Sequence, residues 1–127
     1  MELVAGLSAS VSLTVTDADT AVALGSGDVP VLATPRLVAL AEAATVAAIA
    51  PHLPPGDTSV GTRVEFDHRA ATPVGATVTA EARLTTVDGR RLGFDVGVRD
   101  GTGAVAEGRV ERVVVDRDRF VARATGG

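Results

Sequence analysis

The stretch ATPRLVALAEAATVAAIAPHLPPGD, residues 33–57, decides the fold of this 127-residue chain. Thr34 stands at an N-cap position, is followed by a proline suited to the first helical position, and precedes an alanine-rich run that a second proline ends. This pattern predicts a helix over residues 35–50. Because Arg36 and Glu42 are its only charged residues, the helix should be wrapped by other parts of the protein and not lie on a wet surface.

The rest of the chain alternates apolar and polar residues in runs that are typical of strands. The expected strands are residues 7–16, 59–69, 76–87, 91–99 and 104–116. Asp-Gly pairs in VDGRR and RDGTG favour hairpin turns, so the later runs should form an antiparallel meander. Residues 17–33 lack periodicity and are expected to be a loop, and the tail after residue 116 should be helical at first and then fray.

This order of elements predicts an α+β protein with the hotdog fold, in which a curled antiparallel sheet of about five strands wraps around one long apolar helix. A length of 127 residues suits a single domain, residues 1–127. The sheet would leave an unpaired edge and the helix would leave apolar surface, and pairing of two protomers covers both. We therefore expect a homodimer.

The composition excludes several classes of function. The formal net charge is −4, and the basic residues are arginines scattered among acids, so a nucleic-acid partner is not expected. The chain has no cysteine, which rules out disulfides and thiolate chemistry. His52 and His68 are the only histidines, a weak basis for a metal site, and we expect neither metal nor cofactor. The N-terminus lacks a signal peptide's basic region, and no apolar run could span a bilayer, so the expected location is cytoplasmic, without membrane partners.

Three residues attract attention individually. His68 ends an expected strand, where a polar residue needs no functional explanation. Glu42 is more informative, because a carboxylate inside an apolar helix is costly unless it is paired, protonated or reaches solvent. Thr34 is fully explained by capping the helix. Each signal alone is weak.

Together these residues resemble a known family. The segments LATPRLVALAEAATVAAIAPHL and SVGTRVEFDHRAATPVGATVTAEARLTTVDGRRLGFDV are similar to the fluoroacetyl-CoA thioesterase branch of the hotdog-fold thioesterases, and the resemblance covers roughly residues 29–115. Matched to the family pattern without a gap, the active-site residues are Thr34, Glu42, Gly61 and His68. The resemblance implies a thioester hydrolase that acts on acyl-CoA.

The implied roles are chemically reasonable. Glu42 would attack the thioester carbonyl or activate water, and His68 would give a proton to the departing CoA thiol. Thr34 would orient His68 or the attacking group. Gly61 would let a backbone N–H approach the thioester oxygen, because it has no Cβ.

Substrate recognition is less clear from the residues. Arg90, Arg91 and Arg112 are candidates for the CoA phosphates, but we expect them to be solvated side chains at strand ends. Specialised members of the family roof the acyl pocket with aromatic side chains from the loop before the threonine, whereas GSGDVPVLA, residues 25–33, has none. The three phenylalanines, the only aromatic residues, lie elsewhere in the chain. Fluoroacetyl selectivity is therefore not expected to follow from the resemblance.

Two alternatives stay open. A non-catalytic hotdog module would bind an acyl-CoA or a small apolar ligand and report it to a partner. A hydratase or dehydratase would use the same fold with other acid and base groups, but the chain lacks the acid and histidine pairing within one short segment that we expect of such enzymes.

Overall fold

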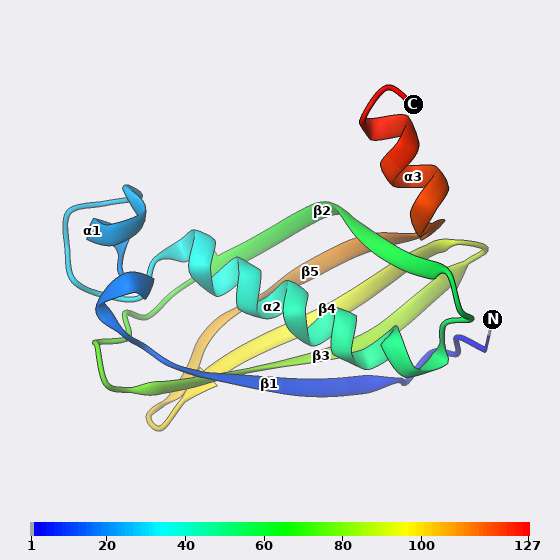
Figure 1. The fold of residues 1–127 in the computed structure, drawn as a ribbon. Coiled ribbons are helices and arrows are strands. Elements are labelled where there is room, and N and C mark those ends of the chain that lie inside the picture. Colours follow the sequence, from blue (N-terminus) through cyan, green and yellow to red (C-terminus); the bar gives the residue numbers. More distant parts are fainter. Residues whose placement is uncertain (1) are drawn as a thin grey trace.

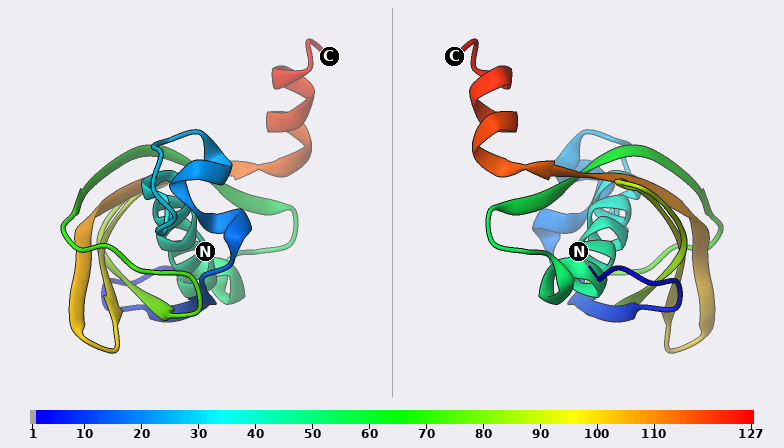
Figure 2. Two further views of the ribbon diagram at one scale, coloured as in Figure 1. Left: turned by 90° about the vertical axis from the view of Figure 1, so that its left-hand side faces the viewer. Right: turned by 90° about the vertical axis from the view of Figure 1, so that its right-hand side faces the viewer.

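The computed structural model describes residues 2–127 and places five strands in one antiparallel sheet, in the order β1-β3-β4-β5-β2. The strands are β1 (Ser8–Thr14), β2 (Asp57–His68), β3 (Thr77–Asp88), β4 (Arg91–Asp100) and β5 (Gly103–Asp116). The helices are η1 (Asp17–Asp19), α1 (Ala21–Leu24), α2 (Thr34–Ile49), η2 (Ala50–His52) and α3 (Arg117–Ala124). The sheet curls around α2, which lies on its concave face (Figures 1 and 2). The predicted hotdog arrangement is confirmed.

The core lies between α2 and the sheet. Its members are apolar side chains that are almost fully buried, among them Leu37, Leu40, Ile49, Val78, Leu84, Phe94 and Val110. Alanines on the inner side of α2 keep the helix close to the strands, because a methyl group takes little space. The helix packs chiefly against β1 and β3 and makes fewer contacts with β2 and β5. The side of α2 nearest β2 therefore has room for polar groups.

The prediction that the helix is wrapped on all sides is wrong for the single chain. Ala39, Ala43 and Val46 are exposed on α2, and Val46 is 41% exposed. One sheet can cover only one side of a helix, and within residues 2–127 no other element covers the opposite side of α2 (Figure 2). An apolar face of this kind is typical of an interaction surface.

The segment predicted as a loop contains two short helices. Thr20 caps α1 by accepting a hydrogen bond from the Ala23 N–H, at 3.3 Å, and Gly25 ends α1 with a positive φ of 69°. These elements are set by local caps and not by apolar periodicity, so the pattern of residues 17–33 did not reveal them. The segment lies beside the N-terminal end of α2, where it forms one wall of a cleft.

None of the helices in residues 2–127 is both long enough and apolar enough to cross a membrane.

Candidate functional site

Thr34 and His68 form the first part of the site. Thr34 is the first residue of α2 and His68 is the last residue of β2, and the Thr34 Oγ1 lies 2.7 Å from the His68 Nδ1. The predicted capping role of Thr34 is wrong. Ala33 occupies the N-cap position, and no side chain caps the helix there. The Thr34 hydroxyl instead bonds the imidazole, which fixes the orientation of the ring.

The other nitrogen of His68 is unsatisfied. Its Nε2 is buried and has no hydrogen-bond partner among residues 2–127. Thr34 and His68 both line a cleft of about 290 Å³, whose other wall includes Gly27, Val29 and Leu32. A buried polar atom without a partner is costly, and in a cleft it is a position where a substrate group can bind.

Glu42 and Arg112 form the second part of the site. Glu42 is half-buried in the middle of α2, and the Arg112 Nη1 donates a hydrogen bond to its Oε2 at 3.2 Å. The Arg112 side chain is only 7% exposed. Its Nε donates to the Ser59 Oγ at 2.9 Å and its Nη2 to the Ser59 carbonyl oxygen at 3.0 Å. Three directed hydrogen bonds thus hold the guanidinium against the carboxylate.

The expectation that Arg112 is solvated at a strand end is wrong. β5 continues to Asp116, and Arg112 points inward from β5 between the buried Val110 and Val114. Burial lowers the pKa of the Arg112 guanidinium, and the Glu42 carboxylate opposes this shift. An arginine stays protonated under such conditions, so Glu42 faces a fixed positive charge. The alternation along β5 contained this signal, because Arg112 shares its face with two buried valines.

Gly61 lies against the Glu42 carboxylate. A Cβ built on Gly61 would collide with the Glu42 Oε2 and lie 3.4 Å from the Arg112 Nη1. The register of β2 against β5 shifts between Gly61 and Arg63, which marks an irregularity at this point of the strand. Only glycine lets the backbone approach the carboxylate this closely.

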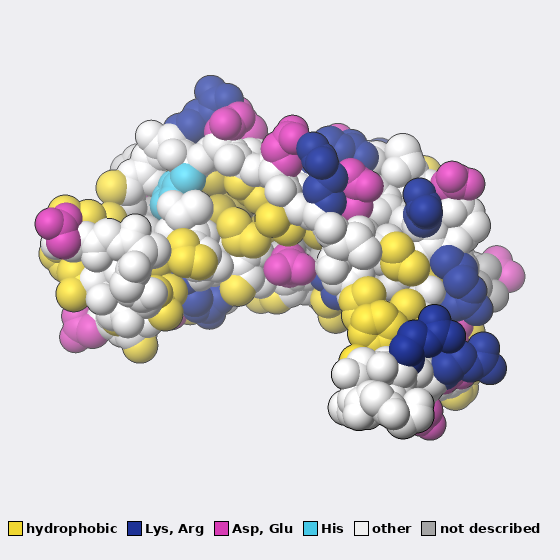
Figure 3. All heavy atoms as spheres, turned by 90° about the horizontal axis from the view of Figure 1, so that it is seen from above, with side chains coloured by type: hydrophobic (Ala, Val, Ile, Leu, Met, Phe, Trp, Pro, Cys, Tyr) yellow, Lys and Arg dark blue, Asp and Glu magenta, His cyan; other side chains and the backbone are white. Residues whose placement is uncertain are grey.

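The four predicted residues come together as two pairs and not as one cluster. Thr34 contacts His68, and Glu42 contacts Gly61 with Arg112, but no hydrogen bond or ion pair joins the two pairs within residues 2–127. Glu42 lies eight positions after Thr34 along α2, a rise of about 12 Å. Figure 3 shows hydrophobic side chains gathered around an acidic side chain in the middle of the face seen from above.

Comparison with known proteins relates the sequence of this chain to one family of enzymes. The sequence profile of the family described as fluoroacetyl-CoA-specific thioesterase matches residues 15–118. A fluoroacetyl-CoA thioesterase of Streptantibioticus cattleyicolor is 45% identical over 93 residues, which are 73% of this chain and 67% of that protein. The chain belongs to the fluoroacetyl-CoA-specific thioesterase family. The predictions of the family and of a thioester hydrolase acting on acyl-CoA are confirmed at this level.

Solved structures of fluoroacetyl-CoA-specific thioesterases agree with this membership. One, of a fluoroacetyl-CoA thioesterase, superposes with a TM-score of 0.92 at 36% identity and covers 99% of this chain and 98% of its own. A thioesterase superfamily member of Thermus thermophilus gives a TM-score of 0.90 at 28% identity, covering 98% of this chain and 92% of its own. Variants of the fluoroacetyl-CoA enzyme have been crystallised with acetyl-CoA, and with fluoroacetate and CoA.

Sequence reasoning missed two residues of the site, Ser59 and the inward-facing Arg112. No cluster of three or more histidine, aspartate or glutamate side chains suited to a metal ion occurs in residues 2–127.

Proposed function

We propose that this protein, as a single hotdog domain, hydrolyses thioesters between a small acyl group and CoA. The observation that carries the proposal is the Glu42 carboxylate, held by Arg112 against the backbone of Gly61. The carboxylate is half-buried, Arg112 fixes its orientation, and the main chain of Gly61 lies next to it. These are the conditions under which it can act as a nucleophile or general base on a carbonyl.

Each residue of the site has a defined step. Glu42 either removes a proton from the water that attacks the thioester carbonyl carbon, or attacks that carbon itself and forms an acyl–glutamyl anhydride. In the second case a water molecule then hydrolyses the anhydride, which frees the acid and restores the carboxylate. Gly61 offers its N–H to the oxygen that becomes negative, where the absence of a Cβ permits close approach. The His68 Nε2 gives a proton to the departing CoA sulfur, and Thr34 holds the ring through Nδ1. The products are a carboxylic acid and the CoA thiol.

In this proposal the active site forms only in a homodimer, because the Thr34–His68 pair and the Glu42–Gly61 pair of one protomer lie too far apart to act on the same substrate. A thioester carbonyl cannot contact Glu42 and His68 together if about 12 Å of helix separates their pairs. A second protomer packed on the exposed side of α2 and the free edge of β2 can bring its Thr34 and His68 to the first protomer's Glu42 and Gly61. Light scattering tests the assembly, and a monomer mass at micromolar concentration would contradict it.

The acyl group is proposed from the walls of the cleft beside His68. The cleft measures about 290 Å³, and its loop wall carries small and aliphatic residues such as Ala21, Val29 and Leu32. Among residues 2–127, no phenylalanine lines it. Such a pocket suits short straight and branched acyl groups in general. It lacks the aromatic roof expected of a site specialised for the fluoroacetyl group.

Thiol release from a panel of acyl-CoAs tests the function. The panel comprises fluoroacetyl-, acetyl-, propionyl-, isobutyryl- and benzoyl-CoA, followed with a thiol reagent. We expect turnover of acetyl- and isobutyryl-CoA with kcat/KM equal to or above that of fluoroacetyl-CoA. Binding of the whole panel without release would contradict hydrolysis and favour a ligand-binding module. A cytoplasmic location is part of the proposal and is tested by cell fractionation.

A further inference from the structure

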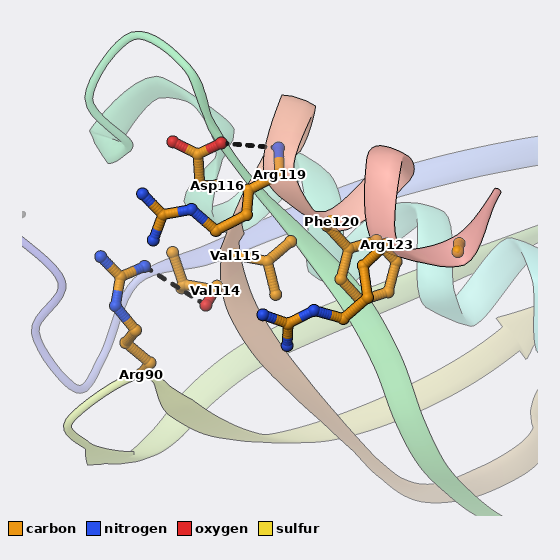
Figure 4. Close-up of a pocket in the computed structure, with 8 residues that line it drawn as sticks. Arg90, Val114, Val115, Asp116, Arg119, Phe120 and Arg123 are labelled. Atoms are coloured by element: carbon orange, nitrogen blue, oxygen red, sulfur yellow. Dashed lines mark hydrogen bonds between the residues drawn. The ribbon is translucent and has the colours of Figure 1, made fainter. Parts of the chain in front are cut away.

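A cleft outside the site described above lies between α3, the β3–β4 turn and the C-terminal end of β5. It measures about 520 Å³, and its lining residues are Arg90, Val114, Val115, Asp116, Arg119, Phe120, Arg123 and Ala124. Figure 4 shows the three arginines reaching toward this space, Arg90 from the β3–β4 turn and the other two from α3. The cleft thus combines guanidinium groups with a phenyl ring.

The charge of the cleft is opposite to that of the chain. Three arginines and one aspartate line it, which gives a formal charge of 3 − 1 = +2, whereas the whole chain carries −4. The Asp116 carboxylate is already engaged, since it caps α3 by accepting the Arg119 N–H at 2.9 Å. Arg90 donates to the Val114 carbonyl oxygen at 3.3 Å and lies 3.7 Å from the Asp57 carboxylate. A positive cleft on an acidic protein favours an anionic ligand.

Arg119 occupies a position that does not serve the stability of α3. It lies in the first turn, where the helix dipole disfavours a cation, and it stands four residues from Arg123 on one helix face, where like charges repel. Arg123 itself lies in the last turn, where the dipole favours a cation. Neither side chain forms an ion pair with any residue in 2–127. A bound anion would relieve both unfavourable interactions.

Phe120 supplies the second kind of contact. Its side chain lines the cleft and is 42% exposed, in a chain that has only three aromatic residues. Exposed aromatic rings and arginine planes form surfaces on which a nucleobase stacks, and arginine forks bind phosphate oxygens in pairs. A ligand suited to this cleft presents phosphate groups to the arginines and a purine ring to Phe120. A phosphorylated adenine nucleotide has both groups.

The cleft lies within reach of the catalytic residues. Arg112, which contacts Glu42, precedes Asp116 by four residues on β5, a distance of about 13 Å along the strand. The extended pantetheine arm of CoA can bridge such a separation between thioester and nucleotide. We propose that this cleft binds the phosphorylated adenosine end of the acyl-CoA substrate, an inference that rests on the proposed function.

The test replaces two arginines and uses two kinds of substrate. In R119Q/R123Q, kcat/KM for acetyl-CoA should fall about 10- to 100-fold through KM, because charge-assisted hydrogen bonds are lost. With acetyl-N-acetylcysteamine, which has no nucleotide, kcat/KM should be unchanged. The matched control is R83Q/R99Q, two exposed arginines outside the cleft, which should behave as wild type with both substrates. Equal losses with both substrates, or no loss with acetyl-CoA, would overturn the proposal.

A titration separates this proposal from the proposed function. Calorimetry with adenosine 3′,5′-bisphosphate needs no turnover, and binding should be seen in wild type and R83Q/R99Q but be lost in R119Q/R123Q and weakened in Phe120→Ala. Inorganic phosphate serves as the comparison ligand. Binding of phosphate as tight as that of the nucleotide would show a general anion site and contradict nucleotide recognition. A wild-type protein that binds the nucleotide but hydrolyses no thioester would contradict only the proposed function.

Discussion

The Glu42 Oε2 lies 3.2 Å from the Arg112 Nη1, and Ser59 holds the other two nitrogens of the same guanidinium. Because Arg112 is almost fully buried while Glu42 is half-exposed, the arginine is the fixed member of the pair. The direction of the carboxylate is therefore set from β5 and not by α2 alone.

Replacing Arg112 tests this relationship. Arg112→Leu should lower kcat about 100-fold, because a displaced catalytic group loses its alignment. Arg112→Lys keeps the positive charge but lacks the planar guanidinium that bonds Glu42 and Ser59 together. Its kcat should therefore lie between those of Arg112→Leu and wild type. Steady-state kinetics with acetyl-CoA and thermal melting check both variants. A folded Arg112→Leu protein with wild-type kcat would show that the pair has only a structural role.

Gly61→Ala should separate activity from stability. The new Cβ would displace the Glu42 carboxylate, which is the mobile end of a side chain, so the fold should lose no more than about 1 kcal/mol. The kcat should fall about 100-fold, because the carboxylate moves away from its position. Gly97→Ala is the control, since a Cβ at Gly97 meets nothing within 4 Å. Similar kcat values for the two variants would argue against a tight approach at Gly61.

Asp19 gives the protein a pH-dependent contribution to stability. The Thr16 N–H, 2.8 Å away, and then the Thr16 hydroxyl and the Arg36 guanidinium hold the pKa of the Asp19 carboxyl below its usual range, against the opposing effect of burial. A lowered folded pKa means that the stabilisation is complete above the unfolded value of about 3.9 and is lost as the pH falls through the folded value. Asp19→Asn should melt below wild type at pH 7, and the gap should close below about pH 4. A gap that is equal at pH 7 and pH 3 would contradict this cause.

Mixed dimers test whether one active site draws on two protomers. Glu42→Gln and His68→Ala proteins should each be nearly inactive alone. After they are mixed under conditions that exchange protomers, half of the dimers are heterodimers and each heterodimer has one intact site, so about a quarter of the wild-type activity should return. Recovery near zero, with exchange confirmed by differently tagged chains, would place each complete site within one protomer.

The strands and α2 were predictable from the sequence because their signals are periodic. Alternation marked the five strands, the Asp-Gly turns set the order of the meander, and the proline-bounded alanine run marked α2. The short helices η1 and α1 were missed because three or four residues cannot show a period, and only their caps specify them.

The resemblance to the family named Thr34, Glu42, Gly61 and His68 as candidate residues, but it did not predict their contacts. The residues next to Thr34 in the sequence do not indicate that its hydroxyl bonds His68 instead of capping the helix. The residues next to Arg112 likewise do not indicate that its side chain contacts Glu42. Both contacts join segments far apart in the chain, 34 and 70 residues in sequence, and depend on how the sheet curls.

The most direct test of the central claim is the kcat for thiol release from acetyl-CoA in Glu42→Gln and His68→Ala, compared with wild type at neutral pH. If Glu42 attacks or activates water and His68 protonates the departing sulfur, each variant should fold and lose about 10² to 10⁴ in kcat, with a smaller change in KM. A folded variant of either kind that keeps kcat within about threefold of wild type would contradict the assignment of this site.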